Sequence, residues 1–303
     1  MDMTNFHVYV GRDQAQTLPE IRKIGPSDVK SALVSGIDDF RAMPSHLAFL
    51  ALVYPLCGMI IAYVTSQQNL LHLLFPLASG FALIGPFAAI GLYEMSRRRE
   101  LGMETSWRHA LNVVRSPSIP SIVALGLLLM ALFLAWLAIA QLLFTWLFGD
   151  ALPTSYGQFL KDVLTTTRGW TLIVLGCFIG FCFALVTFSV SVVAFPLLLD
   201  RDVGAAAAVA ASIRAVAENP VAMALWGLVV VAALIIGSAP FFVGLVIIMP
   251  ILGHATWHFY RRVIVRDPTQ EHPVDWPAEP LPGSAHERVA PHSFLFPWPK
   301  EKP

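Results

Sequence analysis

The chain has 303 residues, of which 56% are hydrophobic and only 13% are charged, and its formal net charge is zero. A soluble domain carries about 25% charged residues, so this composition argues against an ordinary water-soluble fold. A net charge of zero says little about partners, and we expect the lipid bilayer rather than a nucleic acid.

Six apolar segments are long enough, or nearly so, to cross a bilayer. A helix that rises 1.5 Å per residue needs about 20 apolar residues to cross about 30 Å of hydrocarbon. None of the six contains Asp, Glu, Lys or Arg, and none shows the alternation of a membrane β-barrel strand. The sequence therefore predicts an all-α integral membrane protein with six transmembrane helices. Their expected bounds are residues 46–65, 70–93, 122–148, 171–199, 221–238 and 241–260.

Residues 1–28 precede the predicted transmembrane domain as a polar stretch, which we expect to be a flexible cytoplasmic arm. The stretch has no basic region followed by an apolar region, so it does not resemble a cleaved signal peptide. A helix is predicted over residues 29–43, before Pro44. This helix either lies in the membrane interface or caps the helix bundle, and the sequence leaves both open. Its apolar stripe consists of Val29, Leu33, Ile37 and Phe40.

The chain also contains an internal repeat. Residues 208–227 repeat the pattern of residues 32–51, and residues 108–126 form a looser third copy. Each copy reads as an amphipathic helix, a proline and an outward span, followed by a loop and an inward span. Such tandem similarity indicates duplication and a pseudo-symmetric bundle. Each inward span carries a late proline, namely Pro86, Pro196 or Pro250.

Basic residues are distributed unequally between the two sides of the predicted bundle. All of those near the spans fall on one side, except Lys161 and Arg168. By the positive-inside rule, both termini and the loop of residues 97–115 are cytoplasmic, and the loop of residues 149–169 lies outside. The expected location is the bacterial inner membrane, with several crossings.

The transmembrane domain is expected to span residues 29–266, and residues 267–303 form a tail rich in proline and polar residues. Such a composition does not support a packed core. Aromatic residues in the tail could dock on another membrane protein, or the protein could associate with itself. The three cysteines all fall in apolar segments, which argues against a disulfide framework.

His254 and His258 stand four residues apart in the last predicted span, hence on one helix face. This spacing can bind a metal ion or lie beside haem, but no third ligand is paired with the two histidines by spacing. A histidine near the cytoplasmic end of a span is more often an interfacial anchor, bonded to backbone or to lipid headgroups. We therefore expect no metal and no cofactor, with a haem or metal redox protein as the alternative.

Arginines mark the cytoplasmic ends of two inward spans. Glu94 precedes Arg97 and Arg98 by three and four residues, which predicts an ion pair within one helix. Arginines at this level determine topology and can also bind anionic lipid headgroups. No nucleotide-binding or hydrolase motif is present, so no catalytic residue is predicted. The candidate arginines are Arg97, Arg98, Arg99, Arg261 and Arg262.

Three stretches carry a family resemblance: GPFAAIGLYEMSRR (residues 85–98), NPVAMALWG (219–227) and PILGHATWHFYRR (250–262). Together they resemble the DUF2189 family of predicted bacterial integral membrane proteins of unknown function, over most of the chain from about residue 24 to residue 266. The resemblance implies a six-span inner-membrane architecture and brings no established activity.

We therefore predict a non-enzymatic membrane protein, either permease-like or an accessory subunit of a larger assembly. The accessory interpretation depends on the absence of charged residues inside the spans. That absence also argues against a proton-coupled pump, because acids within a membrane usually mark transport routes. The sequence does not determine the substrate or the oligomeric state.

Overall fold

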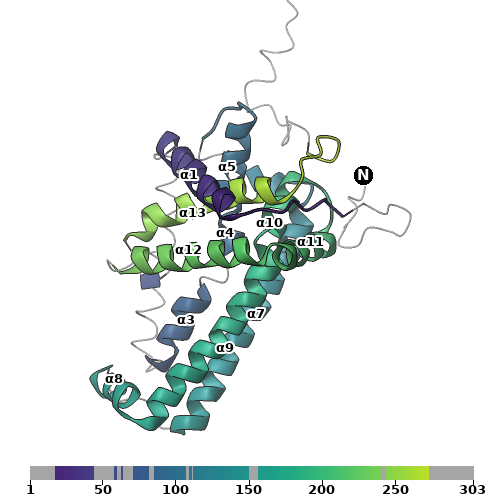
Figure 1. The fold of residues 1–303 in the computed structure, drawn as a ribbon. Helices are drawn as coiled ribbons and strands as arrows, with labels where there is room; N and C mark the ends of the chain where they lie inside the picture. Colours follow the sequence, from purple (N-terminus) through teal and green to yellow (C-terminus); the bar gives the residue numbers. More distant parts are fainter. Residues whose placement is uncertain are drawn as a thin grey trace, which may run out of the picture. The chain divides into compact units, whose positions relative to one another are not determined.

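The computed structural model describes residues 18–43, 58–59, 63, 71–81, 85–106, 109–110, 112–149, 156–239 and 243–272. These residues form helices, connecting loops and two isolated β-bridges. The all-helical class predicted from the sequence is confirmed for this part of the chain. The helices, shown in Figure 1, are α1 (Pro26–Ala42), η1 (Leu71–Leu73), α3 (Leu74–Phe81), α4 (Gly85–Ala88), α5 (Ile90–Glu100), η3 (Asn112–Arg115), α7 (Ile119–Phe148), α8 (Tyr156–Thr165), α9 (Thr167–Ser191), α10 (Ala194–Asp200), α11 (Ala205–Glu218), α12 (Pro220–Ser238) and α13 (Leu245–Val263).

Four helical stretches among the described residues are long and apolar enough to cross a membrane. They correspond to the second, third, fourth and fifth predicted spans. The first predicted span falls almost entirely outside the described residues. The last one forms α13, which is less apolar because its C-terminal half carries two histidines and two arginines, so the count of six spans stays a prediction. The four stretches are Leu74–Glu100, Ile119–Phe148, Thr167–Asp200 and Pro220–Ser238.

The long helices α7 and α9 pack side by side (Figure 1). Both still expose apolar side chains. A helix that is apolar on all sides is expected only where its outer face is also removed from water. These exposed side chains therefore fit contact with lipid hydrocarbon. They include Leu127, Leu142, Trp146, Val174 and Phe178.

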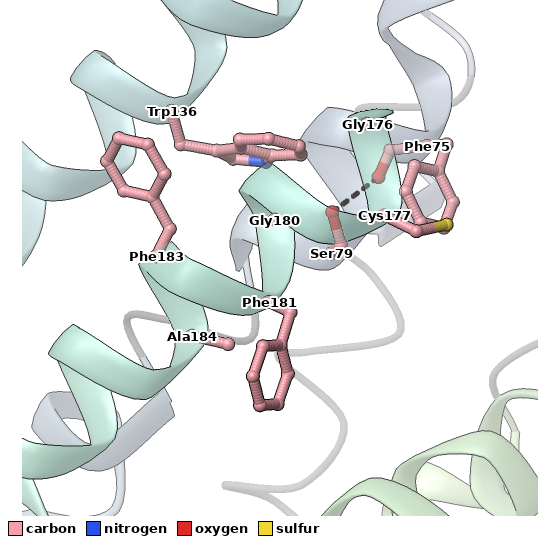
Figure 2. Close-up of a pocket in the computed structure, with 9 residues that line it drawn as sticks. All are labelled: Phe75, Ser79, Trp136, Gly176, Cys177, Gly180, Phe181, Phe183 and Ala184. Carbon is pink, nitrogen blue, oxygen red and sulfur yellow. Dashed lines mark hydrogen bonds between the residues drawn. The ribbon is translucent and has the colours of Figure 1, made fainter. Parts of the chain in front are cut away.

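Trp136 of α7 holds α3 and α9 together. Its indole N–H donates to the carbonyl of Pro76 at 3.0 Å. A Cβ added to Gly80 would lie 2.9 Å from the indole, and one added to Gly180 would lie 3.1 Å from it. The two glycines therefore make room for the ring between two helices. An apolar pocket opens beside this contact, with Phe75, Cys177 and Phe181 on its walls (Figure 2).

The late prolines of the three predicted inward spans have different effects on their helices. Pro196 has no N–H to offer the carbonyl of Val192, and a turn at residues 192–193 separates α9 from α10. Pro86 lies in the short α4, which a turn at Ala89 separates from α5. Pro250 lies inside α13, which continues past it. The breaks let α10 contact both α5 and α13.

Helix α1 packs along α13 and also contacts α12. Of the predicted apolar stripe only Val29 is fully buried, and the other three residues are half-buried. The face of α1 that is buried therefore differs from the predicted one and consists mainly of small residues, with one acid. Small side chains allow the backbones of α1 and α13 to approach each other. Of the two alternatives that the sequence left open, these contacts favour a cap over the bundle. The buried residues of α1 are Val29, Ala32, Gly36 and Asp39.

Gly36 allows this close approach, so a side chain there is expected to separate α1 from α13. A Cβ at Gly36 would lie 2.5 Å from the backbone nitrogen and 2.6 Å from the Cα of Ala255. Overpacking costs about 1–3 kcal/mol, and each kcal/mol shifts the midpoint by roughly 2–4 °C in a protein of this size. We expect Gly36→Val to lower the melting temperature in detergent accordingly. Val34→Ala, on the exposed side of the same helix, is the control, and equal midpoints for the two variants would contradict the packing.

The repeat is only partly visible among the described residues. In the second unit, the amphipathic α11 leads directly into α12, whose first residue is Pro220. In the third unit, the described residues before α7 include the short η3, and residues 109–110 are also helical. The first unit continues after Pro44 into residues outside the described part. The three-unit repeat therefore stays a prediction.

Candidate functional site

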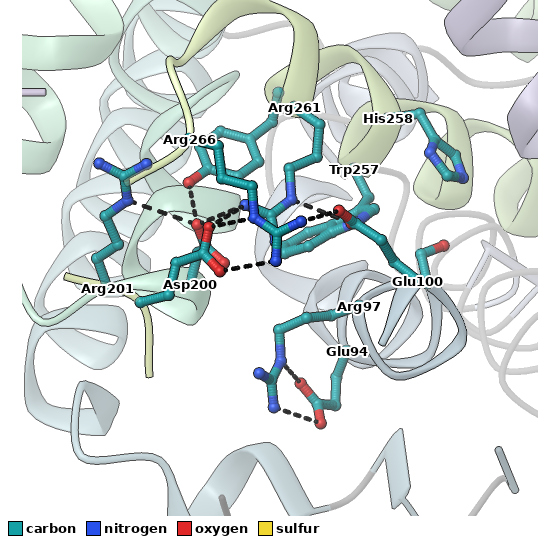
Figure 3. Close-up of polar contacts among 12 residues, drawn as sticks. Glu94, Arg97, Glu100, Asp200, Arg201, Trp257, His258, Arg261 and Arg266 are labelled. Atoms are coloured by element: carbon teal, nitrogen blue, oxygen red, sulfur yellow. Dashed lines mark hydrogen bonds and ion pairs between the residues drawn. The ribbon is translucent and has the colours of Figure 1, made fainter. Parts of the chain in front are cut away.

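Charged side chains gather where α1, α5, α10 and α13 come together (Figure 3). Many of them are buried, although burying a charge is costly unless it is paired and hydrogen-bonded. The partners of each group therefore show how the ends of these helices are held. The buried charged or titratable residues of this region include Asp39, Glu94, Arg97, Arg98, Asp200, Arg201, His254, Tyr260 and His272.

Asp39 of α1 stands at the centre of a hydrogen-bonded group that we call the Asp39 chain, made of Asp39, Ser96, His254 and His258. Ser96 Oγ donates to Asp39 Oδ2 at 2.6 Å and lies 2.6 Å from His254 Nδ1. His258 Nε2 lies 2.9 Å from Asp39 Oδ2. Arg99 pairs with the other carboxylate oxygen. The chain thus joins α1, α5 and α13.

The hydrogen positions in the Asp39 chain follow from its donors and acceptors. Burial raises the pKa of Asp39, but hydrogen bonds from His258 and Ser96 outweigh burial and leave the pKa below its usual value. A carboxylate only accepts, so the single hydroxyl hydrogen of Ser96 points to Asp39. Ser96 Oγ then accepts from His254 Nδ1–H. Neutral His254 is left with a bare lone pair on Nε2.

That Nε2 atom of His254 is unusual. The side chain is 0% exposed, and Nε2 has no hydrogen-bond partner among the described residues. Buried polar atoms are nearly always hydrogen-bonded, and the exceptions call for an explanation. The nitrogen is a buried acceptor that a hydrogen-bond donor or a proton could use.

The order of residues in the Asp39 chain differs from that of a serine hydrolase. In the hydrolase triad the histidine stands between serine and aspartate and removes the serine proton. Here Ser96 stands between Asp39 and His254, its hydroxyl points at a carboxylate, and it is fully buried. The arrangement does not activate Ser96 as a nucleophile.

Both histidines of the pair have side-chain hydrogen-bond partners. Both imidazoles converge on one carboxylate, His258 directly and His254 through Ser96. Within the described ranges, no group of three or more His, Cys, Asp or Glu side chains could hold a metal ion. The haem or metal alternative therefore gains no support from this geometry.

The predicted ion pair within α5 is formed, and it is deeply buried. Arg97 Nε donates to Glu94 Oε2 at 2.8 Å, and Arg98 lies 3.8 Å from the other oxygen of Glu94. The side chains of Glu94 and Arg97 are 0% and 2% exposed. Arg98 also donates to the carbonyl of Glu104. The pair therefore lies inside the protein, where each partner depends on the other.

Arg261 of α13 links three other parts of the chain (Figure 3). Its guanidinium bonds to Glu100 of α5 at 3.0 Å, to Asp200 of α10 at 3.0 Å and to Glu271 at 3.1 Å. It also lies over the ring of Trp257, 4.8 Å from the centroid, a favourable cation–π distance. This arginine fixes the ends of the inward helices to one another.

Residues 74–200 match the DUF2189 family model, which is described as a predicted integral membrane protein. The resemblance inferred from the sequence motifs is thus confirmed over that range, and the membrane nature of the chain is supported. No curated protein and no solved structure matches the chain.

The DUF2189 match runs from α3 to α10 and so divides the site. It includes Ser96, the Glu94 ion pair and Asp200, whereas Asp39, His254 and His258 lie outside it. The polar region is therefore completed by helices on either side of the matched region.

Two of the five candidate arginines remain accessible to lipid headgroups. The side chains of Arg99 and Arg262 are 41% and 36% exposed, even though Arg99 pairs with Asp39 and Arg262 lies 3.4 Å from Asp28. Arg97, Arg98 and Arg261 are mostly covered. Headgroup binding stays a prediction, and it concerns chiefly the two exposed arginines.

The described parts of the N-terminal arm and of the C-terminal tail are hydrogen-bonded to the ends of α13 and α10. Arg22 N donates to Val263 O at 2.7 Å, although residue 22 belongs to the arm predicted to be flexible. After α13, His272 N donates to Asp200 O at 2.8 Å. Residue 272 belongs to the predicted tail, residues 267–303. The described parts of arm and tail therefore contact the bundle.

The sequence did not reveal Asp39, Ser96 or Asp200 as members of the site. Asp39 lies outside the apolar spans, beside the exposed Asp38. A signal was available, because Ala32 and Gly36 precede Asp39 by seven and three residues on the same helix face. A stripe of small residues that leads to an acid indicates a close helix contact with a buried charge.

Proposed function

We propose that this chain is a multi-pass, six-span protein of the bacterial inner membrane, with both termini cytoplasmic and a permease-like, non-enzymatic function. The observation that carries the proposal is the Asp39 chain, a buried polar group with an unpartnered ring nitrogen at the ends of apolar helices. Buried ionisable groups are expensive, and in membrane proteins they usually mark transport routes. The four candidate spans and the family match support the membrane location.

The same observation favours a permease over an accessory subunit. The accessory interpretation depended on the absence of charges from the predicted spans. Helix α1, which is not a candidate span, brings Asp39 to two histidines of α13. A subunit with only a structural role has no need for an unsatisfied nitrogen beside a buried carboxylate.

Purification in mild detergent distinguishes the two functions. Mass spectrometry of the tagged, full-length protein is expected to show the chain alone or as a homo-oligomer. A second membrane protein present reproducibly in equal amounts would instead identify an accessory subunit.

Cysteine labelling tests the six-span topology. In a variant without native cysteines, a single cysteine at Lys161 or Ala239 is expected to react with an impermeant reagent added outside the cell. A cysteine at Asp267 should react only after the membrane is opened. The first two positions are exposed in the structure, and Asp267 is half-buried. The cysteines to be replaced are Cys57, Cys177 and Cys182.

The informative comparison is between the two external positions. Labelling at Lys161 together with protection at Ala239 would mean that α12 and α13 form a re-entrant pair. The protein would then have four crossings and the proposed topology would be wrong.

A further inference from the structure

We propose that His254, Ser96 and Asp39 form a proton relay that leads from the interior of the helix bundle to the protein surface at His258. The proposal rests on the proposed permease function and adds the proton as a species that the protein carries. Each link is a hydrogen bond already in place, at 2.6 Å, 2.6 Å and 2.9 Å from His254 to His258.

The relay has two different ends. At the inner end, Nε2 of His254 is a bare acceptor with no partner among the described residues and no exposure. At the outer end, the side chain of His258 is 22% exposed. A continuous chain of hydrogen bonds that joins a buried nitrogen to an accessible one is the arrangement that proton transfer needs.

The hydrogen-bond directions determine the direction of transfer. A proton that binds Nε2 makes His254 an imidazolium, which gives its Nδ1 proton to Ser96 Oγ. Ser96 at the same time gives its own hydroxyl proton to Asp39 Oδ2. The serine regains a neutral hydroxyl, the histidine is neutral with its proton on Nε2, and Asp39 becomes a neutral carboxyl.

The last transfer is from Asp39 to His258. In the tautomer that carries its proton on Nδ1, His258 accepts the carboxyl proton at Nε2 and releases the Nδ1 proton to solvent. Exchange with solvent lets the exposed His258 ring return to its other tautomer. The inner part is reset when the Ser96 hydroxyl rotates back toward Asp39 and neutral His254 changes tautomer, its one proton moving from Nε2 to Nδ1. One proton enters at His254 and one leaves at His258, so no further proton is lost and the chain is unchanged after each passage.

The groups around the relay favour the resting state described. Arg99 of α5 pairs with Asp39 and holds its carboxylate in the charged form. A proton that reaches His254 is passed on through Ser96 to Asp39, which α1 contributes.

Proton uptake by liposomes tests the relay. Full-length protein is reconstituted, a potassium diffusion potential is imposed, and internal pH is followed with a trapped dye, without added solute. Wild-type protein is expected to conduct protons above the level of protein-free liposomes. Ser96→Ala and His254→Gln are expected to reduce the rate about a hundredfold, the order that a positioned proton donor contributes.

Two control variants separate the relay from folding. Ser96→Thr keeps the hydroxyl and is expected to keep most of the rate. Asp38→Asn changes the exposed acid next to Asp39 and is expected to have no effect. Absence of flux in wild type, or equal flux in Ser96→Ala, Ser96→Thr and wild type, would overturn the relay. Neither result would change the labelling and purification outcomes that test the proposed function.

The tautomer of His254 gives a second readout, because a merely structural role does not require the proton to be on one particular ring nitrogen. Nitrogen NMR of ¹⁵N-histidine-labelled protein at neutral pH is expected to show His254 with its proton on Nδ1 and a bare Nε2. The opposite tautomer would break the transfer order and overturn the proposal even if all variants fold.

Discussion

Replacing Asp39 by alanine is expected to lower the free energy of unfolding of the detergent-solubilised protein by about 1–3 kcal/mol, the cost of leaving a buried hydrogen-bonding group without its partner. The substitution leaves Arg99 and His258 without their shared carboxylate. It also removes the acceptor of the buried Ser96 hydroxyl. Denaturant unfolding followed by tryptophan fluorescence measures the change in the free energy of unfolding. The expected cause is a weaker contact between α1 and α13.

Asp38 provides a matched control one residue away on the same helix. Its side chain is 57% exposed and lies 4.0 Å from that of Arg41, which is 76% exposed. An exposed pair contributes about 0–1 kcal/mol, so Asp38→Ala should be nearly neutral. Similar losses for the two substitutions would show that Asp39 is not the centre of the α1–α13 contact.

Replacing Glu94 by alanine is expected to cost more, about 3–5 kcal/mol, because both partners of its ion pair with Arg97 are buried. Arg97 would keep its charge at 2% exposure without the carboxylate that now accepts two of its hydrogen bonds. The nearby Arg98 would lose the same partner. Thermal unfolding in detergent should show the loss as a clearly lower midpoint.

A double substitution distinguishes a broken pair from a lost side chain. Glu94→Leu combined with Arg97→Met removes both charges and fills their space with apolar side chains. Because apolar replacement of a whole buried pair is often neutral, the double variant should recover much of the stability that Glu94→Ala loses. Glu218→Ala disrupts the exposed pair with Arg214 in α11, whose side chains are 33% and 46% exposed, and should cost less than about 1 kcal/mol. A double variant no more stable than Glu94→Ala would contradict the account.

Local features of the site were predictable because they depend on spacing within one element. The Glu94–Arg97 contact follows from the three-residue spacing on a helix, and the structure confirms it. The apolar runs predicted four of the stretches long enough to cross a membrane, since length and composition alone decide that property. The break before α10 follows from the missing N–H of Pro196.

The partners of these local features were not predictable from spacing. His258 and Asp39 are 219 residues apart in the chain, and their contact exists only because α1 lies on α13. Arg261 appeared as a topology residue, whereas the structure places it among carboxylates from α5, α10 and the segment after α13. Such contacts depend on how whole helices pack.

The sequence by itself determined the helical membrane class, the ranges of most spans and the ion pair inside α5, because hydrophobic length and helical spacing act between near neighbours. Only the tertiary structure decided that Asp39 is buried and that it reaches His258 directly and His254 through Ser96. The physical reason is the close approach at Gly36, where a missing side chain lets two backbones meet. Burial then requires each polar group carried into the contact to find a partner from another helix.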